Sequence, residues 1–350
     1  MTSKNAAAKP PDLAKAALGA TGLRITRTGL GAWAIGGGGW AFGWGPQDDA
    51  ASVAAIRHAV ASGINWVDTA AAYGLGHSEE VVARALRDLP RSDRPYVFTK
   101  CGLVWDERDR AALPRRVGHP ASLRREVEAS LRRLGTERID LYQMHWPAED
   151  GTPLEDYWGT LLQLKTEGKI GAAGLSNHSA AQLEAAERIG HVDTLQPHFS
   201  AIARGVAAAE LPWCEAHGTG VIVYSPMNAG LLTGAFTVER AERLGPDDWR
   251  SRAPEFTGAA LRRNLALAAG LEPIARGRGV SVAAVAVAWT LAWRGVTGAI
   301  VGARSPDQVD GWRAGAALTL SDTDLAAIAA AIASTGAGSG PARPPRPPDA

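Results

Sequence analysis

Short apolar runs alternate with longer segments of helical periodicity along most of this chain. One of the helical segments carries Leu123, Val127, Leu131 and Leu134 on a single apolar face. An apolar strand followed by an amphipathic helix is typical of a parallel βα unit. The runs that we interpret as strands cover residues 29–35, 64–69, 96–100, 139–144, 170–176, 192–197, 220–226 and 298–303. Eight such units favour an α/β fold closed into a (β/α)8 TIM barrel over an open doubly wound sheet.

Helix start signals fall between the predicted strands. Ser179 and Gln182 have the spacing of a capping box, in which each side chain bonds the other residue's backbone N–H. Thr152 and Glu155 repeat this spacing, with Pro153 between them at the first helical position. We therefore expect helices to begin near residues 153 and 180.

The two ends of the chain differ from its middle. Residues 1–15 are polar and rich in Ala and Lys, and residues 335–350 are rich in Gly, Pro and Arg; we expect both segments to be disordered. Residues 16–334 show no linker-like break and form one predicted barrel domain. Within it, residues 18–30 hold Thr21-Gly22 between two short extended runs, which predicts an N-terminal β-hairpin at the bottom of the barrel.

Composition restricts the class of function. A formal net charge of +1 gives no reason to expect a nucleic-acid partner, and no apolar run reaches the roughly 18 residues of a membrane span. Cys101 and Cys214 form neither a disulfide framework nor a zinc site by their spacing. We expect a cytoplasmic, reduced protein that binds a small molecule and no metal. Nothing in the sequence indicates its oligomeric state.

Polar side chains follow the predicted strands at the end where a barrel carries its active site. Asp68, Tyr73, Lys100 and His145 follow three neighbouring strands, so a carboxylate, a phenol, an ammonium group and an imidazole should converge. Taken singly, these residues have structural explanations: a helix cap, a loop contact, a surface charge and a buried core histidine. Their shared placement favours a catalytic group over four unrelated structural roles.

Six segments resemble one known family. They are GINWVDTAAAYGLGHSEEVVARAL (63–86), VFTKCG (97–102), IDLYQMHWP (139–147), GLSNHS (174–179), VIVYSPMNAGLLTG (221–234) and IVGARSPDQV (300–309). In this order and spacing they are similar to the aldo-keto reductases, and the resemblance runs from about residue 18 to residue 330. It implies a barrel enzyme that reduces an aldehyde or ketone with NADP(H), or catalyses the reverse oxidation.

The resemblance also implies roles for single residues. Asp68, Tyr73, Lys100 and His145 match the family's catalytic tetrad. Ser176, Asn177 and Gln196 are implied to bond the nicotinamide carboxamide, and Tyr224 to stack on the ring. The whole implied cofactor site is Trp33, Asp68, Ser176, Asn177, Gln196, Tyr224, Ser225, Pro226, Met227, Asn228, Leu231, Gly302, Ala303, Arg304 and Gln308.

The chemistry of the tetrad follows from charge. A free tyrosine has a pKa of about 10, too high for efficient proton transfer near neutrality. One ammonium about 4 Å away stabilises a phenolate by on the order of 4 kcal/mol, enough to lower this pKa by about three units. We therefore expect Lys100 to activate Tyr73, Asp68 to orient Lys100, and neutral His145 to hydrogen-bond the carbonyl oxygen.

Arg304 is the reason to expect NADP(H). It precedes Ser305-Pro306 at the start of the last core helix, and a guanidinium beside helix N-terminal N–H groups suits a 2′-phosphate. The alternative is a solvated surface arginine. The chain departs from the family where Trp312 replaces a frequent Asn, which leaves the adenine contact open or replaced by stacking. His178 and Phe199 also stand at positions where other aromatic residues are frequent.

A tryptophan-rich loop follows the first predicted strand. Residues 36–45 form either a mobile aromatic wall of the pocket or a packed surface loop, and Trp40, Trp44, Trp105 and Trp146 are our candidates for the substrate pocket. The motif Gly29-x-Gly31-x-x-Ala34 imitates a Rossmann fingerprint. It leads into four glycines rather than a helix, so we reject that interpretation.

Three alternative functions stay open at this point. Lys100 could be the Schiff-base lysine of a barrel aldolase, although this would leave Tyr224 and Arg304 without a role. The chain could also be a regulatory protein that keeps the fold and cofactor but turns over slowly. A third alternative is a biosynthetic enzyme that acts on a sugar or natural-product ketone. The substrate and the physiological direction are not readable from the residues.

Overall fold

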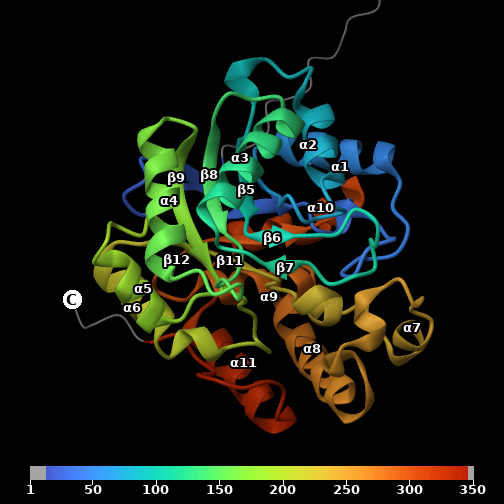
Figure 1. The fold of residues 1–350 in the computed structure, drawn as a ribbon. Helices are drawn as coiled ribbons and strands as arrows, with labels where there is room; N and C mark the ends of the chain where they lie inside the picture. Colours follow the sequence, from blue (N-terminus) through green and yellow to red (C-terminus); the bar gives the residue numbers. More distant parts are fainter. Residues whose placement is uncertain (1–12, 346–350) are drawn as a thin grey trace, which may run out of the picture.

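A closed barrel of eight parallel strands forms the centre of the computed structural model, which describes residues 13–345 (Figure 1). The strands are β3 (Thr28–Gly31), β4 (Trp66–Asp68), β5 (Tyr96–Cys101), β8 (Ile139–Met144), β9 (Ile170–Ser176), β10 (Thr194–Gln196), β11 (Gly220–Tyr224) and β12 (Val296–Gly302). They follow one another around the barrel in chain order, and β12 closes it by pairing with β3. The predicted (β/α)8 fold is confirmed.

Helices surround this barrel (Figure 1). They are α1 (Asp49–Ala61), α2 (His77–Leu86), α3 (Pro120–Leu134), α4 (Leu154–Thr166), α5 (Ala180–Glu187), α6 (Glu210–His217), α7 (Val238–Glu242), α8 (Gly258–Arg278), α9 (Val282–Leu291), α10 (Pro306–Arg313) and α11 (Asp322–Thr335). In α3 the predicted apolar face is turned inward, with Leu123 and Val127 fully buried. Burying such a stripe is what fixes an amphipathic helix against a sheet.

The predicted helix starts are correct in position, but only one has the predicted cap. Ser179 and Gln182 form the full capping box of α5. Pro153, not Thr152, is the N-cap of α4, and no side chain caps this helix. Proline has no backbone N–H that needs a partner, and its fixed φ suits the start of a helix. Helix α4 therefore begins at Pro153 although no side chain accepts a hydrogen bond from its first backbone N–H groups.

The N-terminal hairpin closes the bottom of the barrel. Strands β1 (Lys15–Ala17) and β2 (Arg24–Thr26) pair antiparallel, and their connection brings Leu18 fully into the interior. Leu18 and Ile25 belong to an apolar cluster inside the barrel whose other members are Trp66, Phe98, Leu141, Ala172, Ile222 and Ile300. The predicted hairpin is present, and its first strand begins before residue 18.

The first glycine of the apparent Rossmann motif has a packing role. A Cβ on Gly29 would lie 2.2 Å from the indole ring of Trp66, far inside contact distance. Trp66 fills this part of the interior and donates its Nε1 proton to the Thr26 carbonyl at 2.9 Å. The motif ends in a single 3-10 turn, Ala34–Gly36, and opens no α-helix, which agrees with the rejection of a Rossmann fold.

The C-terminal segment corrects the predicted domain boundary. Residues 336–345 are described and lie against the barrel: Arg204 donates to the carbonyls of Ala337 and Gly340 at 3.0 and 3.1 Å, and Ala203 pairs with Ser339. A Gly-rich composition hid these backbone contacts, which depend on the distant Arg204. The expected disorder of residues 1–12 and 346–350 lies outside the described residues.

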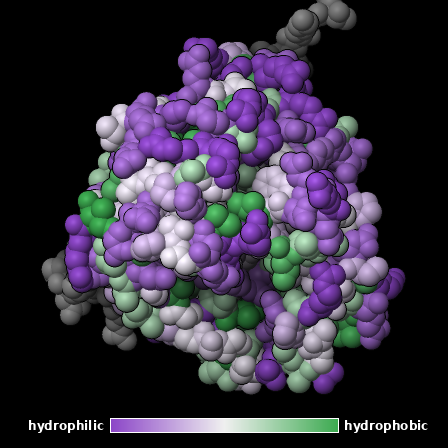
Figure 2. All heavy atoms as spheres, viewed as in Figure 1, coloured by the Kyte–Doolittle hydropathy of each residue, from purple (hydrophilic) through white to green (hydrophobic). Residues whose placement is uncertain are grey.

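A short second hairpin, β6 (Leu103–Val104) with β7 (Arg115–Arg116), follows β5. The face that carries this hairpin is hollowed near its middle, with hydrophobic residues at the edge of the hollow (Figure 2). Among residues 13–345, no single helix has the length and apolar character to cross a membrane. Only α8 and α9 taken together pass such a test, with a bend of 94° between them.

Candidate active site

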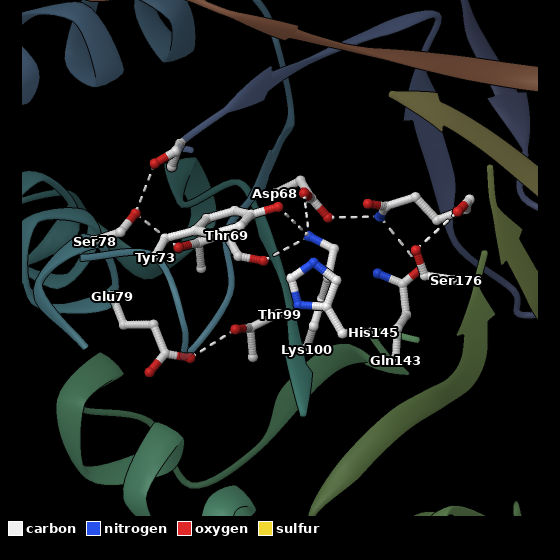
Figure 3. A network of polar contacts seen from close by, with 12 residues as sticks. Asp68, Thr69, Tyr73, Ser78, Glu79, Thr99, Lys100, Gln143, His145 and Ser176 are labelled. Atoms are coloured by element: carbon white, nitrogen blue, oxygen red, sulfur yellow. Dashed lines mark hydrogen bonds and ion pairs between the residues drawn. The ribbon is translucent and has the colours of Figure 1, made fainter. Parts of the chain in front are cut away.

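The ammonium group of Lys100 is the centre of a buried polar network (Figure 3). It lies on β5 and donates to Asp68 Oδ1 at 2.5 Å, to the Thr69 carbonyl at 2.8 Å and to the hydroxyl of Tyr73 at 3.4 Å. The ring of His145 packs edge-on against Tyr73, with centroids 5.7 Å apart. The structure therefore brings together all four residues that the strand-end argument had selected.

The local fold explains this convergence. Asp68 ends β4, Lys100 lies near the end of β5, and His145 directly follows β8, and these three strands are neighbours in the barrel. Tyr73 lies in the turn after β4, whose end is tied to the next strand by the Thr69 N–H donating to the Phe98 carbonyl at 2.8 Å. Parallel strand ends meet at one rim, so sequence separation does not separate the side chains.

Burial controls the charges of these groups. It lowers the pKa of His145 well below the ordinary value, with the charge on Lys100 as a second cause, so this imidazole is neutral. Burial also raises the pKa of Tyr73 well above 10, and the nearby charge of Asp68 raises it further.

The pKa of Tyr73 differs from the sequence-based expectation. We expected Lys100 to lower it, but Lys100 is paired with Asp68 at 2.5 Å, and the pair has little net charge to offer a phenolate. Burial without a free cation favours the neutral phenol. Tyr73 is therefore a protonated group in this structure.

The residues expected at the nicotinamide carboxamide bond one another. Gln196 Nε2 donates to Asp68 Oδ2 at 2.9 Å, and Ser176 Oγ donates to the Gln196 carbonyl at 2.8 Å. Asn177 Oδ1 accepts a hydrogen bond from the Tyr224 hydroxyl at 2.9 Å, and Asn177 Nδ2 donates to the His145 carbonyl at 3.0 Å. The network thus runs without interruption from the tetrad to Tyr224.

A cavity of about 430 Å³ opens beside this network, in the size range of small-molecule sites. Ten of the expected cofactor residues line it: Trp33, Asp68, Tyr224, Ser225, Pro226, Met227, Gly302, Ala303, Arg304 and Gln308. The other expected residues do not. Leu231 is fully buried in the core, and Asn228 is buried and accepts from Ser200 at 3.2 Å. Ser176, Asn177 and Gln196 lie outside the lining, in the network just described.

One end of the cavity is rich in arginine. Arg240, Arg250 and Arg304 all line it, and within the described residues the carboxylate that pairs with this group is Asp248, 2.5 Å from Arg250 Nη2. Burial and the charge of Arg250 lower the pKa of Arg304, as expected where cations are crowded. An excess of guanidinium groups suits a ligand that carries phosphate.

A sequence model of the aldo/keto reductase family matches residues 29–333. The chain belongs to the aldo/keto reductase family. It is 34 % identical over 291 residues to aldo-keto reductase YhdN of Bacillus subtilis (strain 168), covering 83 % of this chain and 85 % of that protein. It is 35 % identical over 320 residues to the NADH-specific methylglyoxal reductase of Escherichia coli (strain K12), covering 89 % and 95 %.

Solved structures agree with this membership. The glycerol dehydrogenase AKR11B4 from Gluconobacter oxydans superposes with a TM-score of 0.83 at 37 % identity, over 94 % of this chain and 98 % of that one. The aldo-keto reductase AKR11C1 from Bacillus halodurans, at a TM-score of 0.74 and 23 % identity over 91 % and 96 % of the chains, shares the fold. As an aldo/keto reductase, the chain is an oxidoreductase of carbonyl and alcohol groups.

Only part of the predicted tryptophan set reaches the cavity of this aldo/keto reductase. Trp44 lines it, as does Trp33. Trp40 is buried and donates to the Gly37 carbonyl at 3.1 Å, and Trp146 lies under the guanidinium of Arg116 at 4.5 Å. Trp105 follows β6 and is also absent from the lining. A strand end fixes the height of a residue on the barrel but not the direction of its side chain.

Sequence reasoning missed the long segment after β11. Trp249 stacks on Trp33 with ring centroids 5.2 Å apart, and Arg240 and Arg250 line the cavity. These residues follow the strand end by too many positions for the strand-end rule to place them. The signal that was present is the charge pattern of residues 239–252, where four arginines lie close together in the sequence.

Two departures from the family pattern are also placed. Trp312 is buried, lines the cavity, and has no hydrogen-bond partner for its Nε1 among the described residues. His178 is buried and bonds the Ser176 carbonyl at 2.8 Å and the Tyr157 hydroxyl at 3.0 Å. Burial lowers the pKa of His178 to about 4, so it is neutral and supports the network from behind.

Proposed function

We propose that this aldo/keto reductase uses NADP(H) to reduce a small aldehyde or ketone, with Tyr73 as the proton donor. The observation that carries the proposal is the triple contact of Lys100 with Asp68, Thr69 and Tyr73 beside the cavity. Neutral His145 and protonated Tyr73 offer two hydrogen-bond donors to one carbonyl oxygen. The chemistry that a reduced nicotinamide supplies when bound is a hydride for the carbonyl carbon.

The residues present fit such a cofactor. Tyr224 lines the cavity with a ring held in place by Asn177, and the arginines at the other end match a pyrophosphate or a 2′-phosphate. During reduction the Tyr73 hydroxyl gives its proton to the oxygen on which charge develops. Lys100 Nζ, 3.4 Å away, donates a hydrogen bond to the oxygen that has lost its proton, and Asp68 keeps Lys100 charged and oriented.

Substitution of Tyr73 tests the acid. Tyr73→Phe keeps the ring and removes the proton, so kcat should fall by about a hundredfold to ten-thousandfold while the Kd for NADPH stays within about twofold of the wild-type value. The substrate panel includes methylglyoxal and glyceraldehyde, since two similar proteins are named methylglyoxal reductase and glycerol dehydrogenase. Turnover close to that of the wild type would remove Tyr73 from the mechanism.

Preference for NADP(H) over NAD(H) rests on Arg304, which lines the cavity. The relative from Escherichia coli is named as an NADH-specific enzyme, so the cofactor preference has to be measured on this chain. Arg304→Ala should weaken NADPH by about tenfold or more and leave NADH within about twofold, the ratio expected for one charge-assisted phosphate contact. Equal weakening of both cofactors would exclude the 2′-phosphate role.

Two alternatives from the sequence lose support. Lys100 is 1 % exposed and its ammonium has three acceptors, whereas a Schiff-base lysine must be a free, neutral amine that reaches the substrate. The second alternative, a regulatory protein with slow turnover, would not need Asp68, Tyr73, Lys100 and His145 to lie together. The buried thiols of Cys101 and Cys214 are both free, which supports a cytoplasmic location as part of the proposal.

A further inference from the structure

The guanidinium of Arg304 is already bonded to another loop of the protein. Its Nε donates to Gln47 Oε1 at 2.5 Å, and its Nη2 donates to the Pro46 carbonyl. Nε and Nη2 form one of the two edges with which an arginine binds a phosphate through two parallel bonds, and Nη1, which completes the other edge, donates to the Trp44 carbonyl at 3.5 Å. The loop between β3 and α1 therefore uses the same donors that a 2′-phosphate would need.

Gln47 holds Arg304 from two sides. While its Oε1 accepts from the side chain, its Nε2 donates to the Arg304 carbonyl at 3.1 Å and to Ser52 Oγ at 2.9 Å. Ser52 belongs to α1, so the amide of Gln47 is oriented by a helix as well as by Arg304. A side chain fixed in this way presents its acceptor without further loss of rotamer freedom.

The loop is anchored on its far side too. The Trp249 N–H donates to the Gly43 carbonyl at 3.0 Å, and Arg252 Nη2 donates to the Ala41 carbonyl at 3.0 Å. The guanidinium of Arg250 lies 4.5 Å above the ring of Trp44. Residues 41–47 are thus held on both sides, Trp44 lines the cavity, and the acceptors at positions 46 and 47 stay close to Arg304.

We propose that Gln47 sets the margin between NADPH and NADH by competing with the 2′-phosphate for the guanidinium of Arg304. This inference rests on the proposed role of Arg304 as the phosphate ligand. NADPH must break the Gln47–Arg304 contact before it gains its own, whereas NADH leaves that contact intact. A ligand that breaks an internal bond binds more weakly by the free energy of that bond.

Two substitutions at position 47 should act in opposite directions. Gln47→Ala removes the competing acceptor and should tighten NADPH by about three- to tenfold, the range expected for the net contribution of one ordinary hydrogen bond. Gln47→Glu offers Arg304 a carboxylate and repels a phosphate, so it should weaken NADPH by about tenfold or more. The Kd for NADH should change by less than about twofold in Gln47→Ala.

The experiment measures Kd by titration calorimetry, without turnover, for NADPH, NADH, adenosine 2′,5′-bisphosphate and 5′-AMP. The last two ligands differ from each other only in the 2′-phosphate, and neither contains a nicotinamide. Gln163→Ala is the matched control, because Gln163 Oε1 accepts from Arg124 Nη2 at 2.9 Å between two outer helices. It breaks the same kind of bond away from the cavity and should leave all four constants unchanged.

A double substitution separates this inference from the proposed function. In an Arg304→Ala background, Gln47→Ala should no longer change the ratio of NADPH to NADH affinity. If Arg304→Ala lowers the ratio but both Gln47 variants leave it within about twofold of the wild-type value, the inference is overturned and the phosphate role of Arg304 stands. If Arg304→Ala leaves the ratio unchanged, both are overturned.

Discussion

The imidazole of His198 lies flat against the ring of Tyr224, with centroids 5.1 Å apart and planes within 13° of each other. Tyr224 also lines the cavity, and in the proposed function its ring stacks on the nicotinamide. Burial lowers the pKa of His198, so the stack is between two neutral rings. His198 thus fixes the plane of the Tyr224 ring, although His198 itself does not line the cavity.

Removal of His198 should loosen that plane. We expect His198→Ala to raise the Kd for NADPH by roughly two- to tenfold, because an aromatic pair contributes about 0.5–1.5 kcal/mol. His198→Phe restores a flat ring and should recover most of the affinity. A fluorescence titration of both variants checks this, and an alanine variant that binds like the wild type would show that Asn177 alone orients Tyr224.

The raised pKa of Tyr73 predicts different pH profiles for the two reaction directions. Reduction needs the protonated phenol, and a pKa raised above 10 keeps this form present as the pH rises. Oxidation needs the phenolate, whose fraction increases about tenfold per pH unit below the pKa. We expect kcat/KM for reduction to stay flat between about pH 7 and 9 while that for oxidation rises steeply. A reduction profile that declines around neutrality would mean that Lys100 lowers the pKa of Tyr73 after all.

His178 should make the folded state sensitive to acid. Its pKa is about 4 in the folded protein and about 6.5 in an unfolded chain. As the pH falls from about 6.5 to 4, the unfolded chain takes up a proton that the folded chain refuses, so stability decreases by on the order of 3 kcal/mol. Urea unfolding at several pH values should show a shallower decrease for His178→Gln, even if this variant starts less stable at pH 7. Identical slopes would assign the acid sensitivity to other groups.

The contact between Gly29 and Trp66 predicts a stability change without a change of site. Gly29→Ala places a methyl group against the indole ring and should destabilise the fold by about 1–3 kcal/mol, the usual cost of overpacking a core. Gly159→Ala is the control, because nothing lies within 4 Å of a Cβ at that position in α4. It should stabilise by roughly 0.5–1 kcal/mol through helix propensity. Thermal unfolding of both variants distinguishes packing from backbone effects.

The extent to which the sequence predicts this structure depends on how local the determining signal is. The strand at Ile139–Met144 was predicted to the residue, because an apolar run between turns depends on neighbours in the chain. The tetrad was also predictable, since parallel strands must end at one rim. The contacts of Arg304 with Pro46 and Gln47 were not, because they join positions 257 or more apart. The raised pKa of Tyr73 depends on burial, which a sequence does not display.

The hairpin beneath the barrel has a consequence for the order in which ligands bind and leave. Leu18 and Ile25 fill the lower opening together with Trp66 and Phe98, so the bottom of the barrel offers no second route to Lys100. A cofactor and a substrate bound as proposed would then both enter from the upper rim. The ligand that binds deeper then has to bind first and leave last, so the hairpin at one end of the barrel sets the order of binding and release at the other end.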